Sequence, residues 1–117
     1  MGYMRHHAIV VTTTYGDLEM ARAKAVDLGC SVSPVIASPV NGVASFLVAA
    51  DGSKDGWPES DDGDRQRVAL VDWLRGWEYE DGSGPFAWVE VQYGDENRQT
   101  RVIDDSDRLR RESIPVA

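Results

Sequence analysis

The stretch Asn41-Gly-Val-Ala-Ser-Phe-Leu-Val-Ala-Ala50 joins a turn signal directly to an apolar strand. Its first two residues both tolerate the positive φ angles that a tight type I′ hairpin turn requires. The apolar residues that follow predict a strand at residues 43–50. Residues 30–40, before the turn, contain Pro34 and Pro39, which have no amide proton to donate, so this segment is expected at the rim of the sheet. The two segments together predict an antiparallel hairpin.

A strand and a helix are predicted before this hairpin. Residues 6–13 contain Ile9-Val-Val11, three consecutive β-branched residues, and continue into threonines, which is typical of a buried strand. Asp17 can cap a helix that ends at Gly29. The apolar residues of this helix fall on one face, and they are Leu18, Ala21, Ala25 and Leu28.

A second helix and a further strand are predicted after the hairpin. Turn-forming residues and a lone tryptophan fill residues 51–63, which indicates a loop. Residues 64–77 have acidic residues at the start of a helical pattern, with an apolar stripe of Leu70, Trp73, Leu74 and Trp77. Residues 86–93 alternate as a strand does. The side chains expected to face the core are Ala87, Val89, Val91 and Tyr93, and those expected on the opposite face are Phe86, Trp88, Glu90 and Gln92.

The predicted order is β-α-β-β-α-β, the split βαβ arrangement in an α+β domain, with two helices on one face of an antiparallel sheet. A candidate fifth strand lies at residues 99–103, and the single domain is expected to span residues 1–103. Residues 104–117 form a charged tail with a candidate short helix at residues 104–111. The sheet face without helices must meet water or pair with another copy, so we expect a homo-oligomer.

Composition and charge exclude several classes of protein. The 117 residues, 42% of them hydrophobic and 27% charged, suit one compact domain. No apolar run reaches the length of a membrane helix, the N-terminus lacks the features of a signal peptide, and Cys30 is the only cysteine. We therefore expect a cytoplasmic protein without disulfides or membrane contact. A formal net charge of −8 repels long nucleic acids, although a few arginines can still bind a small anion.

No catalytic or metal-binding motif is evident. His6 and His7 are adjacent, so on a strand they point to opposite faces and cannot share one metal. The aspartates within residues 51–64 lack EF-hand spacing, and the later ones suit the positive end of a helix. The glycines match neither a P-loop nor a dinucleotide fingerprint. We expect no catalytic residues, no metal and no cofactor.

What remains is a set of residues that suits a base or ribose with phosphate, because arginine and lysine bind phosphate while aromatic rings stack on bases. The candidate ligand-binding residues are Lys54, Trp57, Arg65, Phe86, Asn97 and Arg101. Each also has an ordinary structural role open to it. Trp57 can cover the edge of the core, Arg65 can pair with a neighbouring aspartate, and Phe86 can fill an oligomer interface.

Several short motifs carry a resemblance to a known family. They are His7-Ala-Ile-Val-Val11, Asn41-Gly42, Asp51-Gly-Ser-Lys-Asp-Gly-Trp57, Ser60, Gly63-Asp64, Asp72-Trp-Leu74, Tyr79-Glu-Asp-Gly-Ser83 and Trp88-Val-Glu-Val-Gln-Tyr-Gly-Asp95. With these motifs the chain resembles the Thoeris anti-defence (Tad) sponges, a group of small phage and prophage proteins. The resemblance covers most of residues 6–95, so Arg101 lies outside it.

The resemblance implies a phage protein that acts in the bacterial cytoplasm and does not catalyse a reaction. Such a protein binds cyclic ADP-ribose signals of bacterial immunity, and in some members cyclic oligonucleotides of the CBASS type, and withholds them from their effector. The resemblance also implies homo-oligomers with ligand pockets at subunit boundaries.

Two alternatives remain open. One is an enzyme that degrades the same signals, with His6, His7 or the aspartate cluster as acid, base or metal ligands. The other is an acidic inhibitor that binds a basic host protein, although the interleaved arginines argue against one continuous acidic surface.

Overall fold

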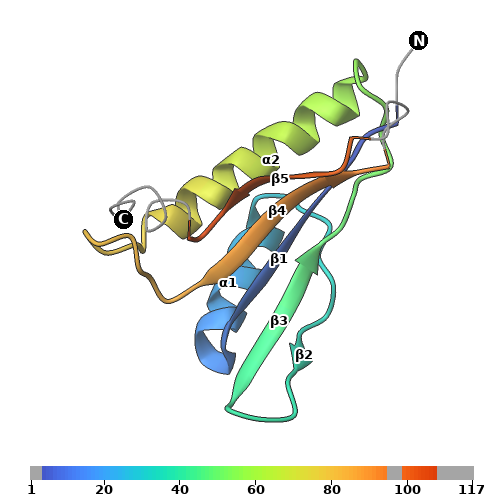
Figure 1. The fold of residues 1–117 in the computed structure, drawn as a ribbon. Coiled ribbons are helices and arrows are strands. Elements are labelled where there is room, and N and C mark those ends of the chain that lie inside the picture. Colours follow the sequence, from blue (N-terminus) through green and yellow to red (C-terminus); the bar gives the residue numbers. More distant parts are fainter. Residues whose placement is uncertain (1–3, 95–98, 108–117) are drawn as a thin grey trace.

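The computed structural model describes residues 4–94 and 99–107 as a single α+β domain. Two helices cover one face of a five-stranded antiparallel sheet and leave the other face open (Figure 1). The elements in chain order are β1 (His6–Thr14), α1 (Tyr15–Asp27), β2 (Ile36–Ala37), β3 (Val43–Val48), α2 (Pro58–Arg75), β4 (Ala87–Tyr93) and β5 (Arg101–Asp105). The predicted fold class and element order are confirmed.

Strand β1 is the centre of the sheet, whose order is β2-β3-β1-β4-β5. It pairs with β3 on one side, from Ile9 opposite Val48 to Thr14 opposite Val43. It pairs with β4 on the other side, where Val11 lies opposite Trp88. Since β3 and β4 are both antiparallel to β1, they run parallel to each other, and α2 crosses over β1 to connect them.

The predicted hairpin is confirmed, but its loop is longer than the two-residue turn expected, because the last strand pair is Ala37 with Ala44. Asn41 and Gly42 have φ angles of 67° and 60°, the left-handed conformation that asparagine and glycine tolerate best. The amide of Ser38 donates to the carbonyl of Val43 at 2.8 Å and closes the loop. β2 contains two residues only, because the prolines before and after it cannot donate to a sheet.

The core lies between the sheet and the two helices. α1 contributes Leu18, Ala21 and Ala25, as predicted, and the two small alanines let the helix approach the sheet closely. α2 contributes Leu70, Val71 and Leu74, and Trp73 packs against the same cluster. The sheet contributes Ile9, Val11, Ala44, Phe46, Val48 and Trp88, with Phe86 beside them. This apolar layer fixes the position of both helices.

The predicted orientation of β4 is wrong. Trp88 and Gln92 are buried beneath the helices, whereas Ala87 and Tyr93 are exposed on the open face. Alternation reveals that a strand has two faces but not which of them meets the helices, and here the large ring of Trp88 fills the space under α2. The open face of β4 therefore carries Ala87, Val89, Val91 and Tyr93, the set predicted for the core.

The predicted boundaries of α2 and of the tail also require correction. α2 begins at Pro58, so the second half of the expected loop at residues 51–63 is helical. Proline at the first helical position and acidic residues in the first turn stabilise this start. At the other end of the chain, β5 extends through Asp105, so residues 104 and 105 belong to the sheet and not to a helical tail. The rest of that expected helix, beyond Asp107, lies outside the described residues.

Neither α1 nor α2 of the described structure is both long enough and apolar enough to cross a lipid bilayer.

Replacing Leu70 by alanine should lower the free energy of unfolding by about 2–5 kcal/mol, because the leucine is fully buried and its loss leaves a cavity. Val68 lies on the same helix and is 60% exposed, so Val68→Ala serves as the control and should change stability by less than about 1 kcal/mol. Urea unfolding of both variants measures the difference. Equal losses would show that α2 does not pack as described.

Candidate functional site

A buried arginine gathers acidic residues from three parts of the chain. Arg67 on α2 is only 7% exposed. Its guanidinium hydrogen-bonds Asp64, one helical turn earlier, and lies 3.7 Å from a carboxylate oxygen of Asp51. Its Nε lies 3.8 Å from a carboxylate oxygen of Glu90 on β4. We call Arg67, Asp51, Asp64, Glu90 and His7 the Arg67 network. A buried guanidinium needs this number of partners, because removing its charge from water costs several kcal/mol.

The loop before α2 is shaped to present Asp51 to this arginine. The backbone amide and hydroxyl of Ser53 both donate to one carboxylate oxygen of Asp51, at 2.9 and 2.5 Å. The other oxygen faces Gly63, where an added Cβ would come within 2.1 Å of it. A side chain at position 63 would therefore displace the Asp51 carboxylate from its place beside Arg67. Burial alone would raise the pKa of Asp51, but the hydrogen bonds from Ser53 and the charge of Arg67 outweigh burial and lower it.

His7 and Glu90 form an acid–base pair beside Arg67. The Nδ1 atom of His7 lies 3.8 Å from a carboxylate oxygen of Glu90, and it is buried with no hydrogen-bond partner among the described residues. Burial and the charge of Arg67 lower the pKa of His7. Burial raises the pKa of Glu90 against the opposing effect of Arg67. The environment therefore favours a neutral imidazole and eases protonation of the carboxylate.

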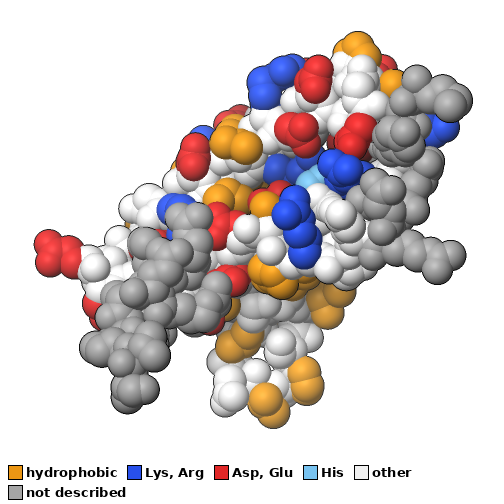
Figure 2. All heavy atoms as spheres, turned by 45° about the horizontal axis from the view of Figure 1, so that its top comes forward, with side chains coloured by type: hydrophobic (Ala, Val, Ile, Leu, Met, Phe, Trp, Pro, Cys, Tyr) orange, Lys and Arg blue, Asp and Glu red, His pale blue; other side chains and the backbone are white. Residues whose placement is uncertain are grey.

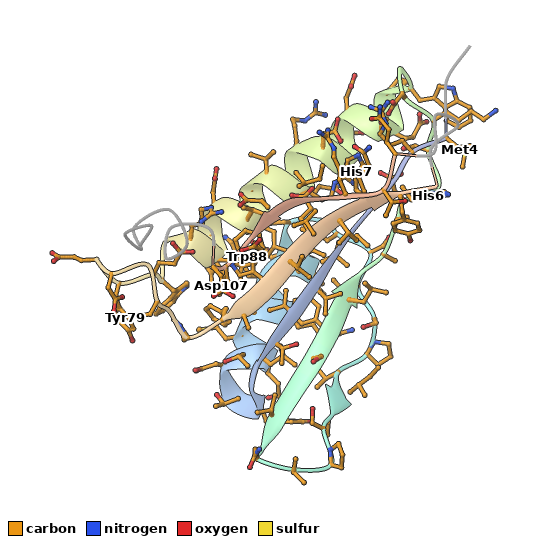
Figure 3. The ribbon with its side chains drawn as sticks, viewed as in Figure 1. Met4, His6, His7, Tyr79, Trp88 and Asp107 are labelled. Atoms are coloured by element: carbon orange, nitrogen blue, oxygen red, sulfur yellow. The ribbon has the colours of Figure 1, made fainter. Side chains whose placement is uncertain are left out.

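These charged groups lie at one end of the sheet. His7 points toward α2, while His6 lies on the opposite face, as the sequence predicts for adjacent strand residues (Figure 3). In the space-filling view, basic and acidic side chains meet beside a histidine in the hollow between α2 and the sheet (Figure 2). The network thus reaches the surface beside the helix.

A cleft of about 420 Å³ lies at the other end of the sheet. β1 contributes Thr12, Thr13 and Thr14, and the loop before β4 contributes residues 82–86. Val43, Ala87, Ser106 and Asp107 complete its lining. The size is in the range of small-molecule sites. We call it the hydroxyl cleft, because threonine and serine side chains supply most of its polar groups.

Helix α1 begins at the wall of this cleft. Thr14, which lines the cleft, is the residue before the helix, and its side chain makes no capping hydrogen bond. A Cβ added at Gly16 in the first turn would meet nothing within 4 Å, so the space beside this turn is open. The first amides of a helix attract polar and anionic groups. The positive end of this thirteen-residue helix therefore begins directly after the cleft lining, where the amide of Tyr15 donates to the carbonyl of Gly42.

A third hollow, the α2–β5 groove, has a volume of about 360 Å³ and separates α2 from the edge of the sheet. Its lining residues are Val68, Val71, Asp72, Arg75, Glu90, Ile103 and Asp104. Arg75 hydrogen-bonds Asp104 and Glu78, and its guanidinium carbon lies 5.0 Å from the ring centre of Trp88. These contacts hold β5 against α2.

The predicted ligand-binding residues do not form one site in the structure. Lys54 and Trp57 share the turn before α2, where the amide of Trp57 donates to the carbonyl of Lys54. Arg65 is exposed on α2 and paired with Asp62, and Arg101 is exposed on β5. Phe86 is buried beyond the far end of α2, in ring contact with Trp73 and Trp77. Asn97 lies outside the described residues.

The structure identifies residues that the predicted set omits. Arg67, with Glu90 and His7 beside it, forms the best-connected polar cluster of the described chain. The sequence offered one signal that Arg67 is buried. It stands three residues before Leu70 and seven before Leu74, a spacing that places all three on the same face of α2. The sequence offered no comparable signal for Glu90. The alternation in β4 shows that the strand has two faces, but it does not show which of them meets the helices.

Comparisons with known proteins found no match to a protein-family model, a curated protein or a solved structure. Within residues 4–94 and 99–107, no group of three or more His, Cys, Asp or Glu side chains is placed to hold a metal ion.

The free energy of unfolding should depend on pH through His7. Because its pKa is lowered in the folded state, the unfolded chain binds a proton first as the pH falls below about 6.5, and the native state loses stability. The charges that act on His7 are Arg67 and Arg5, which lower its pKa, and Asp64 and Asp55, which raise it. In His7→Gln this loss should disappear, so the variant should gain stability relative to wild type between pH 7.5 and 5.5. Urea unfolding at both pH values measures the gain.

His6→Gln is the matched control, since His6 lies on the same strand but on the opposite face. Comparing each variant with wild type separates the effect of His7 from that of Glu90, whose raised pKa acts in the opposite direction. An equal change in both variants would exclude His7 as the source.

Proposed function

We propose that the protein binds a small nucleotide-derived signal and sequesters it without degrading it, and that the hydroxyl cleft receives the ligand. The observation that carries this proposal is the position of the cleft. The cleft, with a volume of about 420 Å³, contains hydroxyl groups of β1 and lies next to the start of α1, which has no side-chain cap. Hydroxyls suit ribose, and helix amides suit phosphate oxygens. Asp107 is the one formally charged residue among the described lining residues.

The motif resemblance supports the same function. One of its motifs, Tyr79-Glu-Asp-Gly-Ser83, forms the loop beside the cleft. In this loop the amide and hydroxyl of Ser83 donate to Asp81, as Ser53 does to Asp51 in the earlier loop. The repeated Asp-Gly-Ser turn gives the cleft a fixed wall. The family implies cyclic ADP-ribose isomers or cyclic oligonucleotides as ligands, and the bacterial cytoplasm as the place where the protein acts.

A second copy of the chain is the proposed partner of the open sheet face. None of the residues of β1, β3 and β4 that face away from the helices is Asp, Glu, Lys or Arg, in a chain that carries 20 acidic and 12 basic residues. Val10, Leu47 and Tyr93 on this face are each between 38% and 40% exposed. The 29 residues of the five strands, at about 4.8 Å between strands and about 3.4 Å per residue, present roughly 470 Å² per copy, so a pair buries roughly 950 Å², close to the value of about 1,000 Å² that a biological interface should reach.

The oligomer and the cleft are adjacent. Thr12, Thr14, Val43 and Ala87 line the cleft and also lie at the edge of the open face. A second copy on this face would therefore sit beside the cleft, in agreement with the pockets at subunit boundaries that the resemblance implies.

An enzyme that degrades the signal is the second candidate, and the His7–Glu90 pair favours it. A neutral imidazole next to a carboxyl group of raised pKa can exchange a proton with a substrate, and Arg67 can stabilise negative charge. Recovery of the ligand after heat denaturation separates the two candidates. A sequestering protein returns it intact, whereas an enzyme yields products in excess of the protein.

Calorimetry against cyclic ADP-ribose isomers and cyclic di- and trinucleotides tests the binding function. Thr14→Val removes a hydroxyl from the cleft without changing the shape of the side chain, and should weaken binding about fivefold, as expected for one lost hydrogen bond. The control Thr100→Val, at an exposed position outside the cleft lining, should bind as wild type does. Loss of affinity in Arg65→Ala but not in Thr14→Val would place the ligand beside Arg65 on α2 and not in the hydroxyl cleft. Absence of binding to every ligand would refute the function.

Light scattering tests the oligomer. The wild-type protein should scatter as a dimer or larger assembly, and Val10→Lys should reduce it to a monomer, because a lysine at the centre of the open face cannot be buried unpaired. Val26→Lys places the same charge on an exposed position of α1 and should leave the assembly intact. A wild-type monomer at high micromolar concentration would contradict the proposal.

A further inference from the structure

The α2–β5 groove contains a carboxylate that is held by long ion pairs only. The side chain of Glu90 is only 13% exposed, and its partners Arg67 and His7 lie at 3.8 Å, beyond hydrogen-bond distance. Glu90 accepts no hydrogen bond from the described residues, and it lines the groove. An ion pair at this distance stabilises the carboxylate less than a close, hydrogen-bonded pair does. A charged donor that enters through the groove can therefore bind Glu90 more closely than Arg67 does.

The charge of the groove indicates the sign of such a ligand. Arg75 is already neutralised by Asp104 and Glu78, both of which it hydrogen-bonds. Asp72 also lines the groove and makes no ion pair within the described residues. The remaining charge on the lining is therefore negative and belongs to Glu90 and Asp72, so a cation is favoured over an anion.

The other walls of the groove are aliphatic. Val68 of α2 and Ile103 of β5 both line the groove and are 60% and 39% exposed, and Val71 lines it as a buried residue of α2. Methylene groups that pack on these side chains are removed from water, which is favourable. A strongly hydrated metal ion gains nothing from contact with aliphatic side chains. A volume of about 360 Å³ accommodates a short alkyl chain.

We propose that the α2–β5 groove is a binding site for a small aliphatic ammonium ion, with its nitrogen at the Glu90 carboxylate and its alkyl chain between Val68 and Ile103. The site is separate from the hydroxyl cleft and does not depend on the function proposed there. Burial raises the pKa of Glu90, and a bound ammonium ion would oppose this effect because it stabilises the charged carboxylate.

The probe for this site is 1,4-diaminobutane, observed by changes in amide NMR resonances during a titration of the full chain. Binding should be saturable, and resonances of Val71, Glu90 and Ile103 should shift most. Butane-1,4-diol has the same carbon chain without charge and should not bind. Magnesium chloride carries the same double charge without the alkyl chain and should not displace the diamine.

Two variants make the test specific. Glu90→Gln removes the charge, keeps the shape and should weaken diamine binding at least about tenfold. Ile103→Trp leaves every charge in place and should block the groove, so it tests the site even if Glu90→Gln disturbs folding through Arg67. Asp62→Asn is the matched control, because Asp62 is an acidic residue of the same helix outside the groove lining, and it should bind as wild type does.

Equal weakening in Asp62→Asn and Glu90→Gln would overturn the proposal, because it would show general attraction to an acidic surface only. The same conclusion would follow from unsaturable shifts spread over the molecule, or from unchanged affinity in Ile103→Trp.

Discussion

The burial of one guanidinium organises half of this domain. Arg67 projects from α2 into the layer between helix and sheet, where an isolated positive charge would be unstable. The sequence supplies its counter-charges from a loop, from the helix itself and from the neighbour of the central strand. The consequence reaches far along the chain. The Asp-Gly-Ser turn, the glycine at position 63 and the inward orientation of Glu90 are all arranged around this one side chain.

The rest of the core is ordinary by comparison, and the two halves of α2 show the contrast. Its C-terminal half packs Leu70 and Leu74 on the apolar centre of the sheet, so its position rests on dispersion and the hydrophobic effect. The position of its N-terminal half depends instead on the ion pairs of Arg67 with Asp51 and Asp64. The candidate sites do not follow this division. The α2–β5 groove runs along the C-terminal half of α2, and Glu90 connects it to the Arg67 network, while the hydroxyl cleft lies at the end of the sheet opposite that network.

The elements that were predictable from sequence are those set by local chemistry. Asn41-Gly42 encodes its turn in two residues, and the alanines of α1 mark its buried face by spacing alone. The start of α2 was missed because an acidic, glycine-containing segment has no apolar periodicity, although Pro58 and Glu59 are typical of a first helical turn. The face of β4 was assigned wrongly for a different reason. Glu90 can lie in the interior because it forms an ion pair with Arg67, which stands 23 residues earlier in the chain. A contact between residues so far apart cannot be predicted from the pattern of neighbouring residues.

The central position of β1 has a consequence for how the chain is made. This strand is synthesised first, and its β3 neighbour follows within about 50 residues, but the β4 neighbour begins only at Ala87. During that interval one edge of the strand keeps its amides and carbonyls unpaired. Pairings between such distant segments close slowly, and the open edge is a place where nascent chains can associate. The acidic loop and helix made in between add negative charge to the incomplete chain, and like charges keep such chains apart while the last strands are still on the ribosome.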